Sequence, residues 1–337
     1  MKTVSRLSYI SLWCLTFGLR LGWSAANSTA DLRDAPTSFR TMNFRSLPTD
    51  ASSHSRHKWS ADLFIVVDDD LGAPSLYAFD RSGTKTFDAM ILLSGADRVR
   101  IDDFSAAPDG SIWVCGHAFS SAGQRSSFIA NATKDGQPIR VIRTDPYSPQ
   151  YLTAAPDGTI WTVGVATGPS RKADLTQDSL RHFDSSGRQI ASGFPAKTLG
   201  FPSFLNGFLD FNQGNLVWRS PSNGVAAKDA TEMYRELSPK DLTVVHSYPT
   251  AARTNTDFAL NAAVTASGRV FVQMWHIPTQ SFDLLELDRR SGQWVSKEGP
   301  NNQSLQRSDG ESLVFATNTS NDKSTFKLQV KDLSVTH

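Results

Sequence analysis

The sequence contains only 2 cysteines, Cys14 and Cys115. Cys14 lies in an N-terminal apolar run that we expect to be removed, so the remaining chain cannot form an internal disulfide. Its stability must therefore come from a packed core and from strand pairing. Cys115 follows Trp113 by two residues in an apolar run. We expect it to be a small buried packing residue rather than a nucleophile.

Short catalytic and nucleotide-binding motifs are also missing. The chain has no G-x-S-x-G, no H-E-x-x-H, no paired C-x-x-C, no P-loop and no G-x-G-x-x-G. It has no excess charge of either sign, because 34 Lys and Arg stand against 33 Asp and Glu. We therefore expect no nucleic-acid partner, since such partners are attracted by a strongly basic surface.

No apolar run is long enough to span a bilayer comfortably. The most apolar stretch, Leu7 to Leu19, follows the basic segment "MKTVSR" and precedes the small residues Ser24-Ala25-Ala26. This order is typical of a secretory signal and predicts a signal peptide over residues 1–26, with an uncleaved anchor as the alternative. We expect a secreted or periplasmic protein with no membrane span after cleavage.

What the sequence does contain is repetition. "DDFSAAPDGSIWVCG" and "QYLTAAPDGTIWTVG" both place a Pro-Asp-Gly turn between an apolar run and a run of β-branched and aromatic residues. Each predicts two strands joined by a hairpin. The turn glycines are Gly110 and Gly158, and similar hairpins can be placed at Gly214, Gly268 and Gly310, at intervals of 42 to 56 residues.

A second series of turn signals alternates with the first. Its turns fall at Gly83, Gly136, Gly187 and Gly292, with weaker members near Asp241 and Asp332. A sixth inner hairpin is expected around "HKWSADLFIVV". Four strands per unit and six units, with no helical periodicity, predict an all-β fold: a six-bladed β-propeller of four-stranded antiparallel blades over residues 58–337.

Residues 27–57 are rich in Ser, Thr, Asp and Arg and have few apolar residues at regular spacing. They predict a flexible lead-in to the propeller. Part of it, Phe39 to Phe44, could add an edge strand. We expect an N-terminal segment of this kind to pair with the C-terminal blade and remove its exposed edge.

The phrase "AAPDGSIWV" followed by "FDxxG" resembles the six-bladed propellers of the NHL and SMP-30/gluconolactonase-like group, and also the sensor propellers of two-component regulators. The resemblance covers nearly all of the chain after the signal peptide, and it implies the fold more strongly than any activity. The Asp-box of sialidases separates its Asp and Gly by one residue, whereas here the two are adjacent, so we exclude that family.

In a propeller the innermost strand of each blade starts at the mouth of the central channel. Residues seven or eight positions before each inner turn glycine should therefore surround this mouth, together with residues just after the second strand. The predicted ligand-binding mouth consists of Asp102, Asp103, His117, Tyr151, Asn206, Arg219, Asn261, His276 and Asn302. Because the sequence offers no orienting partner for His117 or His276, we expect neither of them to be catalytic.

The resemblance to SMP-30-like lactonases also implies a divalent cation, Ca²⁺ or another, held by oxygen ligands near the mouth. Asp68, Asp102 and Asn206 are the residues that match such a role, with Asn261 and Asn302 as further candidates. Polar residues at strand starts also occur simply because they cap turns in water, and this alternative stays open.

We expect an exported, monomeric propeller that binds a small molecule or a protein partner at its polar mouth without chemistry. The alternative is a metal-dependent hydrolase or lyase of the SMP-30-like type, which would act on a lactone or an ester at the same mouth.

Overall fold

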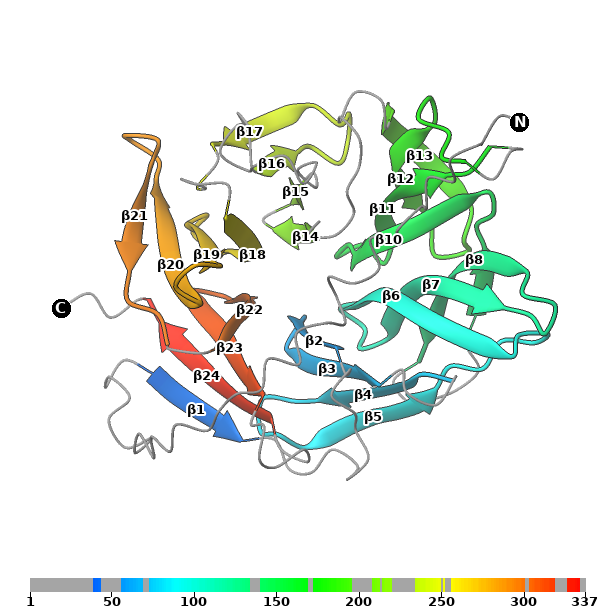
Figure 1. Ribbon diagram of the computed structural model, residues 1–337, viewed down its shortest axis with the longest axis horizontal. Coiled ribbons are helices and arrows are strands. Elements are labelled where there is room, and N and C mark those ends of the chain that lie inside the picture. Colours follow the sequence, from blue (N-terminus) through cyan, green and yellow to red (C-terminus); the bar gives the residue numbers. More distant parts are fainter. Residues whose placement is uncertain are drawn as a thin grey trace, which may run out of the picture. The chain divides into compact units, whose positions relative to one another are not determined.

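The structure is a computed structural model that describes residues 39–43, 56–68, 73–133, 140–168, 172–195, 208–212, 214–219, 234–249, 251, 256–300, 303–318 and 326–333. All regular elements in these ranges are β-strands, and they form six antiparallel sheets of four strands each. The sheets stand in a ring within the unit Thr37–His337 (Figure 1). This confirms the six-bladed β-propeller. The described residues include no helix long and apolar enough to cross a membrane.

Each blade contributes one strand to each of four positions, from the axis outward. The innermost strands are β2 (Arg56–Ser60), β6 (Arg98–Ala106), β10 (Tyr147–Ala154), β14 (Phe208–Asn212), β18 (Asp257–Val264) and β22 (Ser304–Asp309). The second strands are β3 (Leu63–Asp68), β7 (Ile112–Phe119), β11 (Ile160–Ala166), β15 (Asn215–Arg219), β19 (Val270–His276) and β23 (Ser312–Asn318). The third strands are β4 (Ser75–Phe79), β8 (Arg125–Ala132), β12 (Asp178–Phe183), β16 (Tyr234–Leu237), β20 (Ser281–Asp288) and β24 (Phe326–Asp332). The outermost strands are β5 (Lys85–Met90), β9 (Arg140–Arg143), β13 (Gln189–Pro195), β17 (Val244–Tyr248), β21 (Gln293–Lys297) and β1 (Phe39–Asn43).

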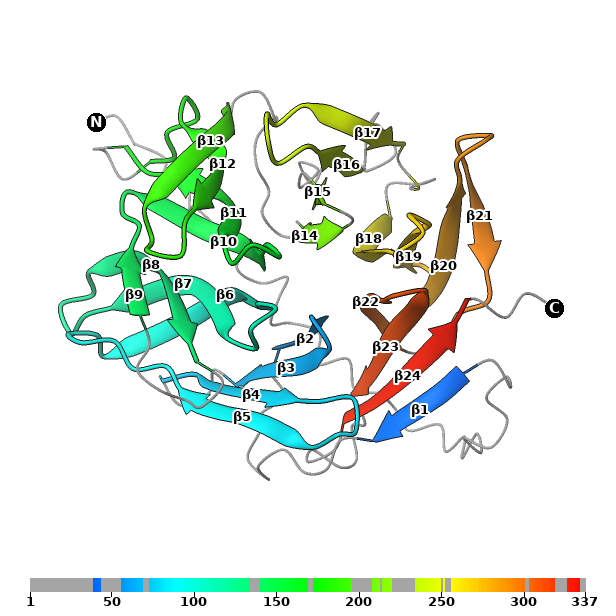
Figure 2. The same cartoon turned by 180° about the vertical axis from the view of Figure 1, so that it is seen from behind.

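The last blade is closed by β1, the first strand that the structure describes. Its order is β22–β23–β24–β1, and β1 pairs antiparallel with β24 from Phe39 opposite Lys331 to Asn43 opposite Lys327 (Figures 1 and 2). The expected closing strand is therefore confirmed. The outer hairpin predicted near Asp332 is wrong, because β24 ends there and β1 takes the place of a hairpin partner.

The core consists of six apolar clusters, one at each junction between neighbouring blades. The cluster between the last blade and the first includes Phe64, Trp59 and Leu328, so burial closes the ring as well as strand pairing does. In β11, Ile160 belongs to the cluster on one side of the blade and Trp161 to the cluster on the other side. The repeated "IW" is therefore apolar at both positions because neighbouring blades cover both faces of the strand.

The inner hairpins have two lengths. In the second, third and fifth blades the turn is long, and the backbone N–H of Ala107, Ala155 and Thr265 donates to the carbonyl oxygen four residues later at 2.8, 2.8 and 2.9 Å. The first, fourth and sixth blades have two-residue turns instead, which are flanked by the pairs Ser60–Leu63, Asn212–Asn215 and Asp309–Ser312. The long turns carry the Pro-Asp-Gly signal or its variant, and the short turns of the fourth and sixth blades place the strand residues nearer to the turn glycine.

In the long hairpins the innermost strand contains a bulge, where one residue has no partner in the register. The skipped residue is Asp102 in β6, Gln150 in β10 and Leu260 in β18. Across from two of these bulges the second strand carries a glycine. A Cβ added at Gly116 would lie 2.0 Å from the carbonyl oxygen of Arg100, and one added at Gly164 would lie 2.1 Å from that of Ser148. The glycine that ends "WVCG" and "WTVG" therefore lets the two strands approach at the bulge.

We predict that Gly164→Ala destabilises the fold by about 1–3 kcal/mol, because the new methyl group meets backbone atoms that cannot move independently of the bulge. Gly168→Ala is the matched control, since the nearest atom to its added Cβ is 3.8 Å away. Chemical denaturation of both variants measures the difference. Equal stability of the two variants would show that the bulge is not rigid.

We also predict that a variant lacking residues 1–43 has a lower melting temperature than the full chain. The loss of a strand that pairs through five residues costs roughly 2 kcal/mol or more and leaves β24 as an exposed edge. Thermal melting and light scattering measure the two effects. An unchanged melting temperature without added association would mean that β1 does not contribute to closure.

Candidate functional site

A cavity of about 370 Å³ lies on the axis of the ring, and all six innermost strands contribute to its wall. It opens at the end of the ring where these strands begin, which we call the start face. The opposite end, with the inner hairpin turns, is the turn face. The start-face cavity is lined by Arg56, His57, Lys58, Asp102, Asp103, Phe104, Tyr151, Leu209, Asn261, Ser304, Gln306 and Arg307.

An ion pair in the wall of this cavity joins the first three blades. Nζ of Lys58 donates to the carboxylate of Asp103 at 3.1 and 3.2 Å and to the carbonyl oxygen of Leu152 at 3.5 Å. The same carboxylate accepts the backbone N–H of Leu152 at 2.9 Å. Burial lowers the pKa of the Lys58 ammonium, and the nearby Asp103 opposes that shift. Asp103 thus offsets part of the cost of burying the Lys58 ammonium.

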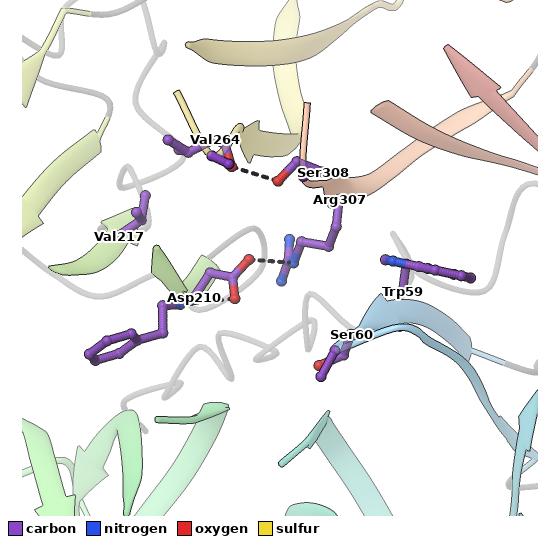
Figure 3. A pocket seen from close by; sticks show the side chains of 11 residues that line it. Trp59, Ser60, Asp210, Val217, Val264, Arg307 and Ser308 are labelled. Carbon is purple, nitrogen blue, oxygen red and sulfur yellow. Dashed lines mark hydrogen bonds and ion pairs between the residues drawn. The ribbon is translucent and has the colours of Figure 1, made fainter. Parts of the chain in front are cut away.

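A second ion pair crosses the axis. Nε of Arg307, on β22, lies 3.0 Å from Oδ2 of Asp210, on β14, although the fifth blade separates these two strands in the ring (Figure 3). Arg307 also lines a second cavity of about 210 Å³ on the turn face, together with the turn residues Ala61, Ala266 and Gly310. The Arg307–Asp210 pair thus stands between the two ends of the channel.

Two further groups in the start-face cavity have fixed roles. Arg56 donates to the carbonyl oxygens of Ile101 and Asp102, the latter at 2.9 Å, and so ties the first blade to the bulge of the second. Burial lowers the pKa of His57 to about 4, so its ring is neutral at neutral pH. With Asp210 paired to Arg307, three cations and three carboxylates meet along the axis.

The structure brings four of the predicted mouth residues together. Asp102, Asp103, Tyr151 and Asn261 line the start-face cavity. Asn206, Asn302 and the side chain of Arg219 lie outside the described residues.

Lys58, Asp210 and Arg307 are cavity residues that the sequence argument did not find. Asp210 and Arg307 stand in two-residue hairpins, four and three residues before the turn glycine. The rule used for the mouth selects residues seven or eight positions before that glycine and therefore misses both. The turn next to Lys58 has no glycine at all, because Ala61 and Asp62 occupy it with φ of 43° and 68°.

His117 lies just outside the cavity and is buried between the second and third blades. Its Nδ1 is 2.6 Å from Oδ2 of Asp102, and its Nε2 is 2.7 Å from Oγ of Ser148. The guanidinium of Arg125 contacts the same Nε2 and donates to Oγ of Ser148 at 3.0 Å. The ring is 6% exposed. The expectation that His117 lacks an orienting partner is therefore wrong, because Asp102 faces it from the neighbouring strand.

His276 has a carboxylate at each ring nitrogen. Nδ1 is 2.8 Å from Oδ1 of Asp257, and Nε2 is 3.1 Å from Oδ2 of Asp283. Burial of the ring opposes its charge, but the hydrogen bonds to the two carboxylates outweigh this, so the pKa of His276 lies above its usual value. Both nitrogens donate, as in a protonated imidazolium. The ion triad holds the start of β18 against β19 and β20 and does not line the cavity.

The predicted metal ligands are not gathered in the described part of the chain. Asp68 ends β3, where it pairs with Ser75, and the carboxylate of Asp102 contacts Arg100 at 3.1 Å as well as His117. No group of three His, Cys, Asp or Glu among the described residues is placed to hold a metal ion. Because Asn206 is outside those residues, the metal site stays a prediction. Cys115 is fully buried, and burial raises the pKa of its thiol, as suits a packing residue.

The sequence matches no protein-family model and no curated protein. Solved structures of similar architecture include TolB from Acinetobacter baumannii, with 12% identity and a TM-score of 0.47; the matched region is 82% of this chain and 65% of the TolB chain. They also include a putative 6-phosphogluconolactonase from Bacteroides uniformis, with 13% identity and a TM-score of 0.41; the matched region is 72% of this chain and 68% of the other. A prolyl endopeptidase (10%, 0.45) covers 82% of this chain but only 38% of its own length. At these values the likeness gives no inference about activity.

We predict that His276 stabilises the fold more at acidic than at alkaline pH. Its pKa is raised in the folded state, so the stabilisation is fully present below the unfolded value of about 6.5 and is lost as the pH rises through the folded value. Melting temperatures of wild type and His276→Gln, measured between about pH 5.5 and 9, test this. The gap between the two should narrow as the pH rises. A gap that is constant with pH would contradict the prediction.

Proposed function

We propose that this protein binds a small, polyhydroxylated molecule, such as a sugar or a sugar acid, in the start-face cavity. The observation that carries the proposal is the convergence of side chains from all six innermost strands on one cavity of about 370 Å³. Cavities that enclose small molecules in proteins are typically about 300–1,000 Å³. The start-face cavity lies near the lower end of that range, which supports a small ligand.

The chemistry of the wall favours a ligand with many hydrogen-bond donors and acceptors. The cavity has cations at Arg56, Lys58 and Arg307 and carboxylates at Asp102 and Asp103, next to amides and a phenol. An apolar ligand would desolvate these charged and polar groups and offer no hydrogen bonds in return, which is costly. A dianion would face two carboxylates. A polyol, or a polyol with one acidic group, can both donate to the carboxylates and accept from the cations.

The wall is also held in place before any ligand arrives. Lys58 is fixed by Asp103 and Leu152, and Arg307 is fixed by Asp210 across the axis. Side chains that are already ordered lose little conformational entropy on binding, so a modest number of hydrogen bonds suffices for measurable affinity. This supports a small molecule rather than a protein as the occupant. A protein partner at the same mouth, and export of the chain, remain expectations from the sequence.

We predict that a panel of monosaccharides, disaccharides and sugar acids contains a ligand that raises the melting temperature and binds in calorimetry. Asn261→Leu should weaken that binding by about 3- to 10-fold, because it removes one donor and one acceptor from the wall. Asn261 is chosen over Lys58, whose removal would leave Asp103 unpaired and threaten the fold itself.

Ser308→Ala is the matched control, because Ser308 lines the turn-face cavity only. It should bind as wild type does. Binding that is lost in Ser308→Ala but kept in Asn261→Leu would place the ligand at the wrong end of the channel, and no binding across the panel would refute the proposal. A stoichiometric divalent cation that is lost in Asp102→Ala would favour the metal-dependent hydrolase instead.

A further inference from the structure

We propose that Ser148 is a nucleophile and that Ser148, His117 and Asp102 form an ester-hydrolysing site for substrates that carry a negative charge. The site lies between the second and third blades, beside the start-face cavity. Asp102 also lines that cavity, but neither Ser148 nor His117 does, so hydrolysis at Ser148 and ligand binding in the cavity can be tested separately. The three side chains come from the separate strands β10, β7 and β6 and meet in the order that acyl-transfer chemistry uses.

The contacts around the imidazole assign its tautomer. Nε2 of His117 touches both the hydroxyl of Ser148, at 2.7 Å, and the guanidinium of Arg125. A guanidinium can only donate, so this nitrogen holds a lone pair and its proton is on Nδ1. Nδ1 lies 2.6 Å from Oδ2 of Asp102. This tautomer is the one in which His117 can accept the Ser148 proton, with the guanidinium of Arg125 turned from Nε2 onto Oγ of Ser148, to which it already donates.

The carboxylate is placed to hold the ring. Oδ2 of Asp102 is buried and has no in-line hydrogen bond, so a small rotation of the imidazole would aim Nδ1–H at it. Asp102 sits at the bulge of β6, whose backbone passes directly over Gly116 of β7. The carbonyl of Ser148 passes over Gly164 of β11 in the same way. Both ends of the arrangement are therefore fixed by backbone approach at a bulge.

Arg125 gives the site its charge preference. It comes from the exposed start of β8, and its guanidinium lies 3.0 Å from Oγ of Ser148, where it can stabilise negative charge that forms next to that oxygen. Arg100 is 55% exposed and pairs with Asp102, and Arg143, on β9, is also exposed on this blade. Against these three arginines stand the carboxylates of Asp102 and Asp145, which both act on Arg125. The remaining excess of cations favours an acyl group or a leaving group that bears a carboxylate or a phosphate.

The reaction is an ordinary two-step hydrolysis with water as co-substrate. The Ser148 oxygen bonds to the ester carbonyl carbon, its proton moves to Nε2 of His117, and the carbonyl oxygen becomes an oxyanion beside Arg125. The carbon–oxygen bond to the leaving group then breaks, and the leaving alkoxide takes the proton from His117. Water repeats the same two transfers on the acylated serine and releases the carboxylic acid and the free hydroxyl.

The first test is labelling of the full chain with a fluorophosphonate, followed by peptide mass spectrometry. Wild type should gain one phosphonyl group on Ser148, and Ser148→Ala should gain none. Ser179→Ala is the matched control, because Ser179 is another buried serine of the third blade and should label as wild type does. Folded wild type that stays unlabelled at Ser148, or labelling that persists in Ser148→Ala, would overturn the proposal.

The second test compares 4-nitrophenyl acetate with 4-nitrophenyl hemisuccinate, which carries a carboxylate. Wild type should prefer the anionic ester by about tenfold in kcat/KM, and Arg125→Gln should lose that preference. Ser148→Ala and His117→Ala should each lower kcat by about 1000-fold or more. Asp102→Asn should lower kcat with KM unchanged, because Asp102 touches the ring and not the substrate. Equal turnover in wild type and Ser148→Ala would overturn the proposal even if sugars bind in the cavity.

Discussion

Each blade of this propeller has an apolar surface on both sides, and only its two neighbours can cover them. The six clusters at the six junctions show that this requirement is met all the way around, including between the last blade and the first. No blade could bury both of its sides alone, so the blades are stable only as a complete ring. This explains the repeated Ile-Trp pairs, because adjacent residues of one strand point to opposite faces of the blade and each must pack against a different neighbouring blade.

The same geometry forces polar side chains toward the axis. Six innermost strands converge there, and no apolar neighbour stands on the far side to bury what they project. Charged groups drawn into this narrow space must compensate one another, because an unpaired buried charge is expensive. Lys58 with Asp103 and Arg307 with Asp210 meet that condition, and each pair joins two different blades. Because these charges are paired, the wall of the channel is polar and ordered, and its net charge is close to zero.

The fold could be predicted from the sequence because turn glycines and alternating runs are local signals repeated at a nearly constant interval. Part of the mouth could also be predicted from the turn glycines, because Asp103, Tyr151 and Asn261 all lie seven residues before a turn glycine in a long hairpin. The rest depended on hairpin length, which differs between blades. Counting residues from a turn glycine could not predict the contact between His117 and Ser148. This contact forms across a junction between two blades and depends on a bulge in the strand register.

The pairing of β1 with β24 has a consequence for the order of folding. Among the described residues, β1 has its sheet partner in β24, about 290 residues later in the sequence. Until then the chain cannot complete the ring, and both strand edges stay available for pairing with other molecules. The ring can therefore close only after β24 has been synthesised.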